Sequence, residues 1–221
     1  MIVRATSNNT HFEPTPSGPQ IGICYGVIGI GSHEQEWKGV KSWKDQVVLL
    51  FELPFCTLEI DGITKPRAIS RIYTLSLHEK ALLRKHLESW RGKKFTPPEL
   101  EDGFDLKKLL GKVCTINVVH SEKGDKTYAN IDTIMGVPAD KKDLTPFNEL
   151  IYFESDTGML IPDDTPDWIK IKIFASQEMN GHSRDDETGQ QNHAPEEVMV
   201  RERIDEQMVR EEFGVEDDGP F

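Results

Sequence analysis

The sequence has few cysteines and no long apolar run. The cysteines are Cys24, Cys56 and Cys114, widely separated and without a CxxC pair. An odd, unclustered set is typical of reduced, buried thiols and not of a disulfide scaffold, so we expect a cytoplasmic protein. No apolar stretch approaches the roughly 18 residues that span a bilayer. No apolar segment follows residues 1–6, so we expect no secretory signal.

Motifs for catalysis are also missing. The sequence contains no G-x-x-x-x-G-K-[ST] phosphate loop, no H-E-x-x-H zinc motif, no G-x-S-x-G nucleophile elbow and no EF-hand loop. Its seven histidines are scattered along the chain. The acid pairs Asp163-Asp164 and Asp185-Asp186 lie in loop-like sequence. We therefore expect no enzyme activity, no metal site and no cofactor.

The negative charge is concentrated in one segment. The chain has 26 basic and 38 acidic residues, a net charge of −12. Residues 178–221 hold 14 of the acids against four arginines and no lysine, a net charge of −10. A segregated acidic block is typical of a disordered interaction tail. We therefore divide the chain into a flexible arm at 1–19, a folded domain at 20–177 and an acidic, largely disordered tail at 178–221.

The folded domain has the pattern of a small, mainly β barrel. Apolar and alternating runs predict strands at 20–30, 46–53, 68–75, 112–120 and 127–137, and Asp61-Gly62 predicts a two-residue hairpin turn. Ser76, with Glu79 three residues later, predicts the N-cap of a helix that Gly92 ends. Three strands, a helix and a two-stranded hairpin give the element order of the five-stranded OB barrel, whose helix lies between strands three and four.

Three segments leave alternatives open. Residues 46–53 are too apolar to have a solvated face throughout. Within this strand, residues 47–53 can be part of the core or of a homodimer surface. Residues 150–154 can add an edge strand. Residues 167–176 can cap the barrel as a strand or as a helix, and periodicity does not decide between them. We place Trp90 and Trp168 in the core.

Binding signals lie in the connections of this barrel. Residues 32–45 join the first two strands and interleave tryptophans with lysines, and in an OB barrel this connection is a ligand loop. Aromatic rings stack on bases, and lysines neutralise phosphates. Residues 121–130 match the second ligand loop. Two further basic residues lie near the central hairpin, and a basic and an aromatic residue share one face of the third strand. The predicted nucleic-acid-binding residues are Trp37, Lys38, Lys41, Trp43, Lys44, Lys65, Arg67, Arg71, Tyr73, Lys123, Lys126 and Tyr128.

The end of the chain carries a resemblance to a known family. An acidic tail closes with Asp217-Asp218-Gly219-Pro220-Phe221. With the barrel before it, this resembles the single-stranded DNA-binding proteins of bacteria and their phages, whose bacterial members end in several Asp followed by Ile-Pro-Phe. Gly219 stands in place of that Ile and removes an apolar contact. The extra N-terminal arm and the segment after the fifth strand favour a bacteriophage or prophage protein.

The resemblance implies a function and partners. It implies a protein that coats single-stranded DNA without sequence specificity in phage DNA replication, recombination and repair, in the host cytoplasm. Asp217, Asp218, Pro220 and Phe221 would then recruit a polymerase, helicase or nuclease. An alternative is a protein-interaction factor that mimics DNA through its acidic tail and binds a host protein without binding DNA. A nuclease or ligase accessory module would require a cluster of catalytic acids, which the sequence does not show.

Overall fold

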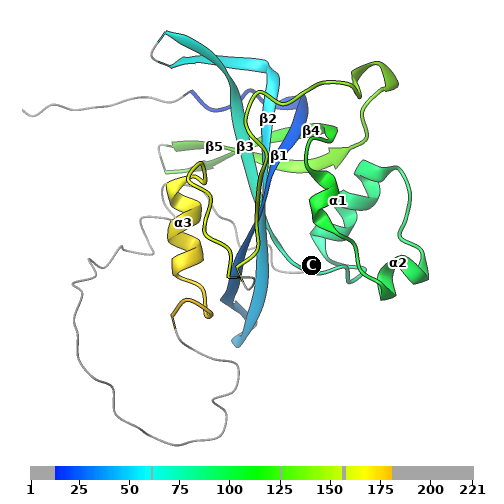
Figure 1. The fold of residues 1–221 in the computed structure, drawn as a ribbon, viewed down its shortest axis with the longest axis vertical. Coiled ribbons are helices and arrows are strands. Elements are labelled where there is room, and N and C mark those ends of the chain that lie inside the picture. The colour runs from blue at the N-terminus through cyan, green and yellow to red at the C-terminus, as the bar shows by residue number, and fades with distance from the viewer. Residues whose placement is uncertain (1–12, 61, 125, 156–157, 181–221) are drawn as a thin grey trace, which may run out of the picture.

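The structure is a computed structural model that describes residues 13–60, 62–124, 126–155 and 158–180 (Figure 1). The predicted partner-binding residues Asp217, Asp218, Pro220 and Phe221 lie outside these ranges, as do residues 1–12 of the predicted arm. The elements are β1 (Gly18–Trp37), β2 (Val40–Ile60), β3 (Ile63–Thr74), α1 (Leu82–Arg91), α2 (Pro97–Glu101), the 3₁₀ turn η1 (Leu106–Leu109), β4 (Val113–Lys123), β5 (Lys126–Met135), the 3₁₀ turn η2 (Ala139–Lys141), β6 (Ile151–Phe153) and α3 (Asp167–Phe174).

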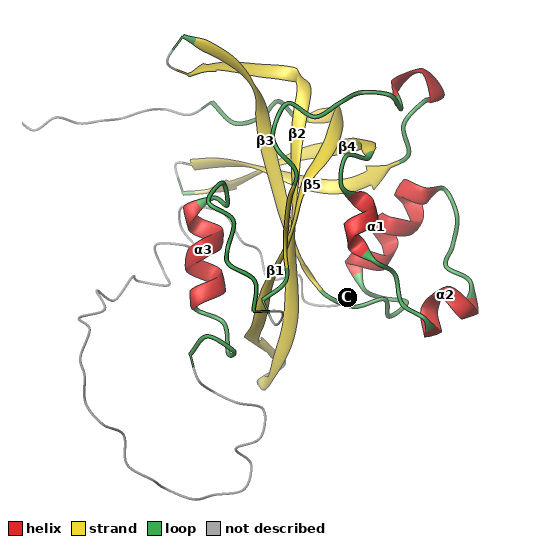
Figure 2. Cartoon of the chain, viewed as in Figure 1, coloured by secondary structure: helices red, strands yellow, loops and turns green. Residues whose placement is uncertain are grey.

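Five long strands form a nearly closed antiparallel barrel in the order β3-β2-β1-β4-β5 (Figure 2). The two outer strands, β3 and β5, run in the same direction because each is two antiparallel pairings away from β1. The Arg71 guanidinium on β3 donates a hydrogen bond to the Ile131 carbonyl on β5 and links these two edges. The helix α1 lies between β3 and β4 in the sequence. This is the OB-like barrel that the element order predicts.

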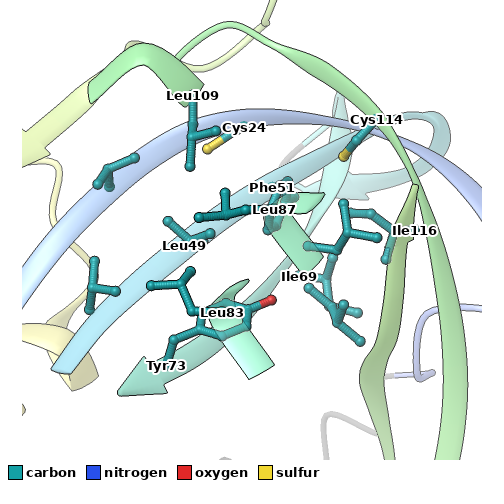
Figure 3. Packing of buried hydrophobic residues seen from close by; sticks show 14 of the residues in the cluster. Cys24, Leu49, Phe51, Ile69, Tyr73, Leu83, Leu87, Leu109, Cys114 and Ile116 are labelled. Atoms are coloured by element: carbon teal, nitrogen blue, oxygen red, sulfur yellow. The ribbon is translucent and has the colours of Figure 1, made fainter. Parts of the chain in front are cut away.

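The barrel interior holds the main apolar core. It contains inward-facing residues of the five long strands together with Leu83 and Leu87 of α1 (Figure 3). The ring of Trp90 packs against this core, and its indole Nε1 donates to the Val113 carbonyl at 2.9 Å. Cys24 and Cys114 are buried free thiols, and Cys56 is half-buried and free. Burial raises the pKa of the Cys24 thiol to about 12, as expected for a structural and unreactive cysteine.

A second apolar cluster covers the outer face of β1 and β2. Val48 and Leu50 of β2 pack there with residues of β6 and with Ile169 and Ile173 of α3. Trp168 is half-buried against the same cluster. The segment at residues 46–53 is therefore apolar because both of its faces are buried within one chain. β6 pairs in parallel with β1, which confirms the expected edge strand.

Glycines in β1 allow neighbouring strands to approach closely. A Cβ atom at Gly22 would lie 2.5 Å from Ile116 Cδ1, and one at Gly26 would lie 2.7 Å from Leu50 Cδ1. The pairing of β1 with β2 shifts register between Cys24 and Gly26 and again between Gly29 and Gly31. Such shifts bend a strand and let it serve both sides of a barrel.

The first helix begins later than predicted. α1 starts at Leu82 after Ala81, which supplies no side-chain cap. Ser76 Oγ instead accepts the His78 N–H at 3.1 Å and closes a single turn, so Ser76 is not the N-cap. The capping box of this region is at α2, where Thr96 and Glu99 bond reciprocally. Gly92 ends α1 in the left-handed conformation (φ 68°), as predicted.

Among the helices that the structure describes, none has the length and apolar character needed to cross a membrane.

Candidate nucleic-acid interface

The first predicted ligand loop is a β-ribbon. Residues 32–37 of β1 pair with residues 40–45 of β2, from Ser32↔Asp45 to Trp37↔Val40. β3 pairs with β2 only from Gln46 onward. At about 3.3 Å per residue, the ribbon projects roughly 20 Å beyond β3. Lys38 (φ 50°) and Gly39 (φ 79°) both have positive φ, as a tight two-residue hairpin turn requires.

This ribbon is not a basic surface. Its three lysines, Lys38, Lys41 and Lys44, are balanced by three acids, Glu34, Glu36 and Asp45. Lys41 Nζ donates to Glu34 Oε2 at 2.9 Å, and this hydrogen bond raises the pKa of Lys41. The ribbon therefore offers a phosphate little net positive charge.

The ribbon does present an aromatic ring. Trp43 lies directly opposite Glu34 in the ribbon. Trp43 is 47% exposed. Lys44, the next residue after Trp43, is also exposed. Trp37 is the last residue of β1, and its side chain lies outside what the structure describes.

The second predicted ligand loop is the β4–β5 hairpin, and it brings three predicted residues together. Lys123 lies directly opposite Lys126, and Ser121 lies directly opposite Tyr128. Because side chains alternate along a strand, Lys123, Lys126 and Tyr128 share one face of this hairpin. Both lysines are exposed and Tyr128 is half-buried. Asn130 Nδ2 donates to Ser121 Oγ at 2.8 Å on the same face.

Two like charges directly opposite each other destabilise a hairpin. An anion bound between Lys123 and Lys126 would remove that repulsion. Without a bound anion, the lysine pair only lowers the stability of the hairpin. A phosphate beside Tyr128 would also place its base within reach of an aromatic ring. This face is therefore a candidate site for a nucleotide.

Two predicted residues of the β2–β3 hairpin have different environments. Lys65 is half-buried, opposite Leu58 on β2. The Arg67 guanidinium donates to the Glu13 carbonyl, and its Nη2 lies 3.8 Å from the Glu13 carboxylate. Arg67 thus holds the chain ahead of β1, and its side chain is only 16% exposed.

Arg71 and Tyr73 do not belong to the interface. They share a strand face, as predicted, but that face points into the barrel. Tyr73 is 2% exposed, and its hydroxyl pairs with His86 Nδ1 at 2.8 Å. His86 Nε2 in turn lies 3.0 Å from the Asp132 carbonyl on β5. These contacts fix α1 to β3 and β5, so the Tyr73 ring has no surface on which a base can stack.

The predicted interface residues lie at two ends of the barrel. The β2–β3 and β4–β5 hairpins precede the parallel strands β3 and β5 and so emerge at the same end, whereas the β1–β2 ribbon emerges at the other. In Figure 1 the ribbon extends to the bottom, and the two hairpins extend to the top and the left. The predicted residues therefore lie on two separate surfaces.

The N-terminal segment connects the two hairpins of the first end. Glu13 contacts Arg67 of β3, and the Thr15 carbonyl lies 2.7 Å from His120 Nε2 of β4. Thr15 is buried there. Residues 13–15 therefore cross this end of the barrel from β3 to β4 and belong to the folded unit.

Sequence reasoning missed an aromatic site on β2. Phe55 is 63% exposed, and Lys141 Nζ lies 5.5 Å from the centroid of its ring. The signal that could have found it was Pro54, because a proline inside a strand pattern marks a bulge that re-aims its neighbours.

Within the described ranges, no three His, Cys, Asp or Glu side chains gather in a way that could hold a metal ion. No protein-family model matches this chain, and no curated protein matches it in sequence. Fold and surface alone therefore define its class: an OB-like β-barrel with projecting hairpins, followed by an acidic segment.

Proposed function

We propose that this protein binds single-stranded DNA without sequence preference. The observation that carries the proposal is the β4–β5 hairpin, where Lys123 faces Lys126 and Tyr128 lies on the same face. OB-like barrels bind oligonucleotides with this loop and the neighbouring strands. Contacts to phosphates and ring faces are indifferent to base identity, so the binding is non-specific.

The acidic segment is proposed to regulate DNA binding and to recruit a partner. Its net charge of −10 across residues 178–221 matches the sign of a phosphate backbone. It competes for the hairpin lysines when DNA is absent and is released when DNA binds. The released tip, with Asp217, Asp218, Pro220 and Phe221, then recruits a replication or recombination protein through a basic-rimmed apolar pocket. A bacteriophage protein acting in host DNA metabolism is the setting that this proposal favours.

The test is the binding of a labelled oligo(dT) strand followed by fluorescence anisotropy at several salt concentrations, with a duplex of equal length as control. We expect binding of the single strand that weakens with salt. Lys123→Gln with Lys126→Gln should weaken it and lower the salt slope by about 0.7 for each phosphate that is no longer neutralised. Lys80→Gln with Lys85→Gln is the matched control, because both lysines are exposed on the α1 side of the barrel.

The competing function is that of a factor whose acidic segment mimics DNA and whose barrel binds a host protein. The neutral β1–β2 ribbon, with Trp43 exposed among balanced charges, suits a protein partner better than a phosphate chain. This function predicts no affinity for any oligonucleotide at any salt concentration. That outcome would reject DNA coating and favour binding of a protein partner.

A further inference from the structure

The pairing of β2 with β3 is interrupted next to the β2–β3 hairpin. Leu53 pairs with Arg67, and the next pair is Thr57 with Pro66. Residues 54–56 therefore have no partners on β3, and Pro54 has no N–H to offer one. Leu53 is fully buried, whereas Phe55 is 63% exposed. The bulge thus turns one aromatic ring out of the barrel.

The segment after β5 holds two further side chains beside this bulge. Lys141, at the end of η2, places its ammonium 5.5 Å from the centroid of the Phe55 ring and 4.0 Å from the exposed Asp140 carboxylate, a separation too long for a hydrogen bond. Farther along, Phe147 is 60% exposed. Its backbone N–H donates to Glu52 Oε1 at 2.7 Å.

Glu52 fixes this segment firmly. Its carboxylate is fully buried and also accepts the Asn148 backbone N–H at 2.8 Å and Asn148 Nδ2 at 2.7 Å. Since Glu52 and Phe55 are three residues apart on β2, the two exposed phenyl rings are carried by backbones tied to the same strand. A rigid support lowers the entropy lost when a ligand orders the site.

A single exposed apolar residue is ordinary and needs no explanation. Here two exposed rings lie on fixed backbones, and a lysine sits over one of them. This hairpin also carries Lys65 and emerges at the barrel end that carries Lys123 and Lys126. Unpaired nucleotides need such a combination, because a base stacks on a ring face while a cation neutralises the adjoining phosphate.

We propose that Phe55 is a base-stacking residue of a second nucleotide subsite, with Lys141 as the cation for the adjoining phosphate. The subsite rests on the proposed function and extends it from the β4–β5 hairpin to the β2–β3 hairpin. A strand that occupies both would pass over the crossing at residues 13–15.

The experiment compares Phe55→Ala, Phe55→Tyr and Phe174→Ala in the full chain, with oligo(dT) anisotropy as the readout. Phe174 is the matched control, an exposed phenylalanine (55%) on α3. Loss of one stacking contact in Phe55→Ala should weaken binding by about 5- to 150-fold. Phe55→Tyr should retain wild-type affinity, and so should Phe174→Ala. Thermal melting followed by circular dichroism checks that each variant is folded.

Photocross-linking of a 5-bromouracil strand, followed by peptide mapping, gives an independent readout. A cross-link at Phe55 or its neighbours supports the subsite. Wild-type binding that Phe55→Ala leaves unchanged, with no cross-link on β2, would overturn the subsite and leave the proposed function standing. If the wild-type chain binds no single strand, the proposed function fails and the subsite with it, and the exposed rings become candidates for a protein contact.

Discussion

The carboxylate of Glu178 accepts a hydrogen bond from the backbone N–H of Ser32 at 2.9 Å. The neighbouring Gln177 N–H donates to the Ser32 carbonyl at 2.9 Å. Gly31 allows this approach, because a Cβ atom there would lie 2.6 Å from both Ser176 Cβ and Glu178 Oε2. The acidic segment therefore starts at the base of the β1–β2 ribbon, and its first acid belongs to the folded unit.

This contact sets where the acidic segment should be cut. Truncation after Asn180 retains the bonds to Ser32, and we expect it to leave affinity for oligo(dT) unchanged or tighter, because a competing negative charge is removed. Anisotropy at low salt measures the change, which should shrink as salt screens the tail. A large loss of affinity on truncation would contradict competition by the tail.

A second prediction separates stability from binding at the β4–β5 hairpin. Lys126→Glu replaces a like-charge pair with an opposite-charge pair facing Lys123, so it should stabilise the fold by about 0.2–1 kcal/mol. The same change should weaken oligo(dT) binding, since one cation is removed and one anion is added. Urea unfolding and anisotropy measure the two effects. If stability and affinity fall together, the lysine pair serves the fold and not a ligand.

The exposed ring of the β1–β2 ribbon gives a third prediction. Trp43→Ala should change stability little, because the residue is 47% exposed. If a base stacks on it, oligo(dT) affinity falls by about 1–3 kcal/mol. Trp43→Phe keeps a ring and should recover most of the loss. Equal affinity in wild type and Trp43→Ala would restrict the interface to the opposite end of the barrel.

Acid should weaken the anchor of α2. A hydrogen bond from the Thr96 backbone N–H, with further bonds from Arg91 and the Thr96 hydroxyl, lowers the pKa of Glu99 from 4.5 to about 2. A lowered folded-state pKa means that the stabilisation is complete above pH 4.5 and disappears as the pH falls toward 2.

Thermal melting of wild type and Glu99→Gln across this range measures the contribution of Glu99. The wild type should be the more stable above pH 4.5, and the difference should close near pH 2. A difference that stays constant with pH would mean that the carboxylate charge plays no part.

The sequence predicted the barrel well because its signals are local. Gly92 ends α1, and Gly62 lies between β2 and β3, and each of these glycines has the positive φ that few other residues adopt. The outer limits of β1 and β2 were missed for a physical reason. In the ribbon both faces are largely solvated, so no alternation of apolar and polar residues marks it as a strand.

Other features depend on contacts distant in sequence. The run from Ile169 to Ile173 alternates like a strand, yet it forms α3, because Ile169 and Ile173 lie one helical turn apart and both are buried on β1 and β2. Alternation also placed Arg71 and Tyr73 on one face without showing that this face points inward. Which face of β3 lies inside the barrel depends on the approach of β3 to β5, and these strands are distant in sequence.

The crossing of residues 13–15 between the β2–β3 and β4–β5 hairpins has a practical consequence. Glu13 is held by Arg67, and Thr15 by His120. Glu13 therefore lies at the barrel end that carries Lys65 and Lys126. Under the proposed function, a label attached at Glu13 would stand beside the single strand and compete with it for space, so binding assays should carry their label elsewhere on the chain.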